Sequence, residues 1–246
     1  HPRLMVTDWE QVKKNIENSY EAQMWYASIK QRADAALSRG PVEYALKDTG
    51  NILDAGRELL NRCIALAFTY NITGDRRYLD KCYDDIIYSG TWPNWSGFVS
   101  SLPTTETVYG VACAYDWLYY DLTPEQRKNI IDVMKKQAMP DFIYNYEGIQ
   151  TSTDYTVSPE GWMVSCNTNI LGMAIAIADE EPEIAEYFIE QIPEICHIMP
   201  ERFYPQGANA SGLMYWSKVN EMLTIYADML DNSFAPGYRL PSHWYI

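Results

Sequence analysis

The sequence predicts an all-α protein made of successive helical hairpins. Nearly every segment places apolar residues at helical spacing, and helix start and stop signals recur along the chain. The alternating pattern of a half-buried strand is weak throughout. Hydrophobic residues make up 47% of the 246 residues and charged ones 21%, a composition typical of globular proteins. About nine to eleven helices are too many for one four-helix bundle, so the hairpins should form an open solenoid or an (α/α) toroid, incomplete or closed.

Two helix starts carry the spacing of a capping box. Thr7 and Glu10 have it near the beginning of the chain. Thr123 and Gln126 have it in a more complete form, because Pro124 stands at the first helical position between them. We therefore predict helices that begin at these two points.

The hairpins follow from paired apolar stripes. One stripe runs through 51–75 and stops at Gly74, and a second fills 76–90 at i, i+3 and i+4 spacing. The alternation recurs in two later pairs, 105–122 with 123–137 and 162–181 with 182–199. Residues 110–120 and 168–178 are apolar or aromatic almost all round. We expect these two segments to be inner helices, surrounded by the others.

Two connections are longer and more aromatic than tight helical turns need, Ser89–Ser101 and Asn145–Trp162. The chain has 20 Tyr and 8 Trp, whose flat faces and polar edges suit sugar rings. For any single ring, packing in the helical core is the alternative interpretation. For the cluster we predict a carbohydrate groove at one end of the fold, rimmed by both loops together with Tyr115 and Trp216.

Charge and composition exclude several classes of partner. A formal charge of -14 argues against nucleic acid, because a phosphate backbone needs a basic surface. Five Cys lie far apart without CxxC spacing and are expected to be buried small hydrophobes, and with three His a zinc site is not expected. We predict no cofactor.

Cellular location is inferred from what the chain lacks and from its first residue. The longest apolar stretch, ILGMAIAIA, is about half the length that a membrane span needs. A start at His1 is compatible with removal of an export signal or with trimming. The sequence therefore predicts no membrane span, and we expect a periplasmic or secreted protein.

Five blocks resemble, in order, the heparinase II/III-like polysaccharide lyases, a family that includes oligoalginate lyases. They are HPRLMVTDWEQVKKNI, LAFTYNITGDRRYLDKC, SSLPTTETVYGVACAYDWLYYDLTPEQR, GWMVSCNTNILGMAIAIADEEPE and YPQGANASGLMYW. The resemblance implies an N-terminal (α/α) toroid, here a single domain over 1–246. It also implies a C-terminal β-sandwich domain, for which this chain has no matching pattern.

The resemblance further implies β-elimination at a uronic acid of an acidic polysaccharide or oligosaccharide. In the family, a Tyr in the block that ends in Tyr-Trp acts as acid, base or both, and Tyr215 is the matching position. A base takes the proton α to the carboxylate, so the site must stabilise the charge that develops. We expect Tyr215 to be catalytic. The residues expected to bind substrate are Trp95, Glu106, Tyr115, Trp162, Asn167, Arg202, Gln206 and Trp216.

The sequence departs from the family pattern in two places. Gln206-Gly207 and Ser211-Gly212 stand where the family usually has Asp-Gly and Glu-Gly. Glu160-Gly161-Trp162 stands where Asn-Asn-Trp or Asn-Asn-His usually precedes the Cys-Asn pair, and a Glu there would repel a uronate. These changes keep a second interpretation open, a divergent toroid that binds glycans without cleaving them.

A third interpretation is a glycoside hydrolase, because toroids also host paired carboxylates. The candidate pairs are Glu106 with Asp116 and Asp154 with Glu160.

Two further expectations concern amides and positive charge. Asn167 and Asn169 lie on an apolar stretch, where they should either cap neighbouring loops or face a groove. An acidic chain that handles an acidic polymer must concentrate its positive charge at the site. We expect Arg202, Lys218 and Arg3 to supply it.

Overall fold

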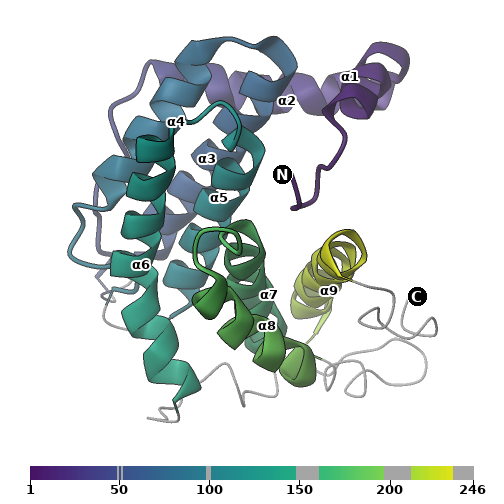
Figure 1. Ribbon diagram of the computed structural model, residues 1–246. Coiled ribbons are helices and arrows are strands. Elements are labelled where there is room, and N and C mark those ends of the chain that lie inside the picture. Colours follow the sequence, from purple (N-terminus) through teal and green to yellow (C-terminus); the bar gives the residue numbers. More distant parts are fainter. Residues whose placement is uncertain (49, 51, 98–100, 148–160, 197–211, 235–246) are drawn as a thin grey trace. The chain divides into compact units, whose positions relative to one another are not determined.

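The computed structural model describes residues 1–48, 50, 52–97, 101–147, 161–196 and 212–234 (Figure 1). This part of the chain contains nine α-helices and no strand, and helices hold 77% of its residues. The prediction of an all-α protein is thereby confirmed. Closure of the helices into a toroid stays a prediction.

The helices group into two compact units. The first comprises His1–Pro2 and Val6–Asp141, and the second comprises Arg3–Met5 and the described part of Phe142–Ile246. The helices are α1 (Trp9–Asn18), α2 (Tyr20–Leu37), α3 (Leu53–Thr73), α4 (Arg76–Ser89), α5 (Leu102–Leu118), α6 (Pro124–Tyr146), α7 (Gly161–Ala176), α8 (Pro182–Cys196) and α9 (Leu213–Ser233). Helix α6 begins in the first unit, and its last turn belongs to the second.

The predicted helix boundaries hold at two points and move by one residue at a third. Thr123 and Gln126 form the capping box, each side chain bonded to the other's backbone N–H at 3.2 and 3.0 Å. Helix α3 ends before Gly74, which takes a left-handed conformation that glycine adopts without strain. The first helix is capped by Asp8, whose carboxylate accepts from the Gln11 N–H, and not by Thr7. The sequence offers both oxygens, and the carboxylate also favours the positive helix N-terminus.

Helix α3 is the centre of the first unit, where it packs against α2, α4 and α5. All residues of α5 except the first are buried, as expected of an inner helix. The two backbones come unusually close, because a Cβ placed on Gly110 would lie 2.5 Å from the Leu60 Cα. Only glycine fits there without moving a helix.

Helix α7 has the same role in the second unit, where it packs against α8 and α9 (Figure 1). All of its residues except Trp162 are buried. A core cluster formed by Met163, Val164, Val219 and Met222 joins α7 to α9. The stretch 168–178, predicted to be inner, lies in this helix and just after it.

The five cysteines are buried free thiols, as the sequence predicts. Burial raises the pKa of Cys113 and Cys196, and the hydrogen bond with Cys82 is the largest cause of the raised pKa of Cys63. A thiol with a raised pKa is a poor nucleophile at neutral pH. None of the described helices combines the length and apolar character needed to cross a membrane.

Candidate functional site

The first turn of α9 presents apolar side chains to solvent. Leu213 and Met214 are exposed, and Tyr215 and Trp216 keep 43% and 38% of their surface accessible. The turn follows Gly212, whose φ of 87° is a conformation that favours glycine. The Tyr215 hydroxyl forms no hydrogen bond with any described residue. The Tyr215 side chain is thus exposed to solvent at this point of the second unit.

The start of α7 lies against the same end of α9. A Cβ on Gly161 would be 2.8 Å from the Val219 Cγ2, and Val219 is one helical turn beyond Tyr215 and Trp216. Trp162 follows directly and is partly exposed. The structure thus brings the start of α7, with Trp162, close to the part of α9 that carries the Tyr-Trp pair.

Asn167 lies inside the second unit, one and a half turns along α7 from Trp162. Its Nδ2 donates to the Met163 carbonyl at 2.7 Å, and its Oδ1 accepts from the Tyr146 hydroxyl. The amide is completely buried. These bonds satisfy the amide within α6 and α7, so it neither caps a loop nor faces an open groove.

Tyr146 is a residue that the sequence analysis missed. It lies in the last turn of α6, where the sequence predicts a loop, and its ring packs edge-on against Phe188 at 5.1 Å. The hydroxyl orients the Asn167 amide. One feature of the sequence could have pointed to it: Tyr146 is a tyrosine at the end of a helix, and the long aromatic connection follows that helix.

The expected positive charge is only partly found here. Lys218 lies on α9 half a turn after Trp216 and is 3.4 Å from Glu221. Arg3 binds the Ile175 carbonyl and Asp179, about 20 Å along α7 from its start, given a rise of roughly 1.5 Å per residue. Arg3 is therefore at the other end of α7. Arg202 and Gln206 lie outside the described residues.

The remaining predicted residues belong to the first unit and face inward. Trp95 is fully buried, and its Nε1 donates to the Ser89 carbonyl at 3.2 Å. Trp92 is also buried. Tyr115 is completely buried on α5 and lies edge-on to the stacked rings of His1 and Tyr119, with ring centres 6.1 and 5.7 Å away. These rings contribute to the core, and a role in sugar binding stays a prediction.

Glu106 forms a two-pronged ion pair with Arg57 of α3. The Arg57 Nε is 2.6 Å from Oε2, and Nη2 is 2.9 Å from Oε1. Arg57 is not predicted as a site residue, because nothing in the pattern of α3 shows which way this side chain points. The carboxylate charge is already neutralised by a guanidinium in the geometry that carboxylates bind best.

Asp116, the other candidate carboxylate on α5, is bonded to His1, with 2.5 Å between Oδ1 and Nδ1. Ten residues separate Glu106 from Asp116, which on one helix is about 15 Å. Glycosidases hold their two carboxylates within roughly 5 to 9.5 Å. The spacing does not support this pair as the acid and base of a hydrolase. Asp154 and Glu160 lie outside the described residues.

The predicted site residues are thus divided between the units. Trp95, Glu106 and Tyr115 belong to the first, and Trp162, Asn167, Tyr215 and Trp216 belong to the second. A groove that combines them stays a prediction. Within the described ranges, no group of three His, Cys, Asp or Glu side chains could hold a metal ion.

Comparison with known proteins adds no family assignment. No protein-family model matches the sequence. No curated protein matches it significantly either.

Proposed function

We propose that this chain is the helical part of a lyase that cleaves a uronic-acid-containing polysaccharide by β-elimination. The observation that carries the proposal is the exposed Tyr215 side chain beside Trp216 at the start of α9. Four other aromatic side chains of the second unit pack against one another, namely Phe142, Tyr146, Tyr187 and Phe188. The ordered resemblance to the heparinase II/III-like lyases supports the same residue.

The chemistry requires a proton to leave the carbon next to the uronate carboxylate and the 4-linked oxygen to depart. Tyr215 would take that proton or deliver one to the leaving oxygen. A tyrosine that acts as a base needs positive or donor groups close to its oxygen. Lys218 is nearby on α9, and Arg202 is the second candidate. Trp216 and Trp162 offer ring faces on which sugar units stack.

A glycan-binding protein without catalysis is the second candidate function. It is favoured by Asn167, because the amide of this predicted substrate-binding residue is occupied by Tyr146 and Met163. Stacking on Trp216 needs no free amide. The two candidates share the binding surface and differ in whether a bond is broken.

The test is a product assay on the protein as its gene encodes it, with alginate and other uronate oligosaccharides. Elimination produces an unsaturated uronide that absorbs in the near ultraviolet. We expect Tyr215→Phe to lose at least 100-fold in kcat, the scale of a general acid or base, while KM stays within about twofold. Tyr187→Phe, a partly exposed tyrosine on α8, is the matched control.

Other outcomes separate the alternatives. Near-normal turnover by Tyr215→Phe would remove Tyr215 from the mechanism. New reducing ends without ultraviolet absorbance would indicate hydrolysis, and binding without products would indicate a glycan-binding protein. The implied β-sandwich domain and a periplasmic or secreted location belong to the same proposal. Cell fractionation tests the second of these.

A further inference from the structure

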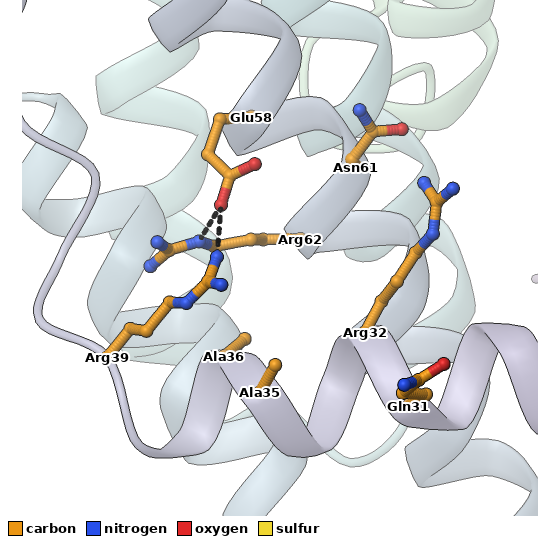
Figure 2. Close-up of a pocket in the computed structure, with 8 residues that line it drawn as sticks. All are labelled: Gln31, Arg32, Ala35, Ala36, Arg39, Glu58, Asn61 and Arg62. Carbon is orange, nitrogen blue, oxygen red and sulfur yellow. Dashed lines mark hydrogen bonds and ion pairs between the residues drawn. The ribbon is translucent and has the colours of Figure 1, made fainter.

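A pocket of about 330 Å³ lies between α2 and α3, and it is lined mainly by basic and amide side chains (Figure 2). The lining residues are Gln31, Arg32, Ala35, Ala36, Arg39, Glu58, Asn61 and Arg62. Glu58, Asn61 and Arg62 share one face of α3 because they are three and four residues apart. The pocket lies entirely within the first unit.

The pocket contains more positive charge than its own acid neutralises. Three guanidinium groups line it, and Glu58 is its single carboxylate. The same Glu58 oxygen accepts from the Arg62 Nε at 2.8 Å and lies 3.6 Å from the Arg39 Nη1. Asp85 lies 3.6 Å from Arg62, but its carboxylate is bonded to Lys81 at 2.7 Å. Two positive charges therefore remain on a chain whose net charge is -14.

The three arginines differ in the contacts that hold their side chains in place. Arg62 is held in place, because its Nη1 donates to the Gly40 carbonyl at 2.8 Å and only 10% of its side chain is exposed. Arg39 follows the end of α2, where a positive charge favours the helix dipole. Arg32 lies in the middle of α2 and forms no ion pair or hydrogen bond with any described residue. Among the described residues Arg32 has no such partner, and its guanidinium lies on the other side of the pocket from those of Arg39 and Arg62 (Figure 2).

We propose that this pocket binds a dianionic oxyanion, a phosphate or sulfate group. A guanidinium presents two parallel N–H donors that match the oxygens of such a group. A phosphate monoester carries a charge of about -1.5 to -2 at pH 7, which matches the two uncompensated charges. Gln31 and Asn61 supply further donors, and Ala35 and Ala36 leave room for the ligand. The proposal is independent of Tyr215 and of the lyase activity.

Titration calorimetry at low ionic strength, with inorganic phosphate, inorganic sulfate and glucuronate as probes, tests the site. We expect phosphate or sulfate to bind, and monoanionic glucuronate to bind several-fold more weakly. Arg32→Gln should weaken phosphate binding roughly tenfold, the effect of one charge-assisted hydrogen bond. Because Arg32 forms no ion pair in the described structure, this variant is expected to fold normally.

Arg76→Gln is the matched control, since it removes the same charge from an exposed position on α4 of the same unit. It should bind phosphate as the unchanged protein does. An equal loss in both variants would show a general charge effect and overturn the proposal. Failure of both phosphate and sulfate to bind at millimolar concentration would overturn it too. Tighter binding of glucuronate than of either dianion would replace it with a carboxylate site.

Discussion

Helices α5 and α7 are both buried along nearly their whole length, but they bury different polar groups. Helix α5 carries two carboxylates, Glu106 and Asp116, and each is bonded to a basic group. Helix α7 carries neutral groups, with Asn167 bonded to Tyr146. A buried charge needs an opposite charge, whereas a buried amide needs only hydrogen bonds.

The difference shows how each helix can take part in function. The Glu106 carboxylate is held in an ion pair with Arg57, and the Asp116 carboxylate is bonded to the His1 ring. An incoming anion would compete with them for Arg57 and His1. The amide of α7 carries no charge, so it neither repels a uronate nor leaves an ion unpaired when it changes partner.

The largest expected difference between α5 and α7 concerns how closely each helix packs against its neighbour. Gly110→Ala on α5 places its Cβ against the Leu60 backbone, so α3 and α5 must move apart. We expect a loss of about 3 kcal/mol in the free energy of unfolding, the upper range of overpacking. Gly161→Ala on α7 meets a Val219 methyl group and no backbone atom, so it should cost less, about 1 kcal/mol. Urea denaturation measures both.

Gly40→Ala is the control for these variants, because a Cβ there would touch nothing within 4 Å. Equal losses for Gly110→Ala and Gly161→Ala would show that the backbone approach in the first unit does not restrict α5.

Salt dependence distinguishes the charged pair from the neutral one. Glu106→Gln breaks the pair with Arg57, and because 48% of the Arg57 side chain is exposed we expect a loss of about 1 kcal/mol. Tyr146→Phe removes the hydroxyl that donates to Asn167 and should cost about 1 kcal/mol as well. In 1 M NaCl the first loss should shrink and the second should not. If 1 M NaCl reduces the losses of stability in both variants equally, then it is wrong that only the α5 pair is charged.

The smallest expected effect concerns a buried acid on α6 that contacts the start of α5. Asp141 on α6 accepts from the Ser101 hydroxyl at 2.8 Å, and burial raises the pKa of its carboxyl group despite that bond. Below the ordinary Asp pKa the group is protonated whether the chain is folded or not. As the pH rises through the raised pKa, the folded protein must ionise a buried acid, so stability is lost. Asp141→Asn should reduce this loss.

Thermal unfolding between pH 3.5 and 7 measures the effect. We expect the variant to gain stability relative to the unchanged protein as the pH rises. Asp132→Asn, an exposed carboxylate on the same helix, is the control. A constant difference between Asp141→Asn and the unchanged protein would contradict the raised pKa.

Local patterns in the sequence predict the helices well. The capping box at Thr123, the stop at Gly74 and the nearly continuous apolar stretches of α5 and α7 depend on neighbours a few residues away. Helix α2 has a weaker pattern, with Tyr20 and Trp25 exposed, and its contribution to the α2–α3 pocket has no signal in the sequence.

Long-range pairing explains what the sequence does not predict about the candidate site. The partners of Glu106 and Asn167, Arg57 and Tyr146, lie 49 and 21 residues away. Aromatic richness does not show which rings are accessible: Trp95 and Tyr115 are buried, whereas Tyr215 and Trp216 are exposed. Only the packing of whole helices determines these differences.

The five buried thiols place a chemical reporter on each of five helices, namely α3, α4, α5, α7 and α8. A thiol that is buried and protonated does not react with an alkylating reagent until its helix opens to water. The order in which Cys63, Cys113 and Cys166 become labelled during mild denaturation would therefore show whether the two units unfold together or one after the other. The natural sequence thus permits a mass-spectrometric record of cooperativity without any engineered label.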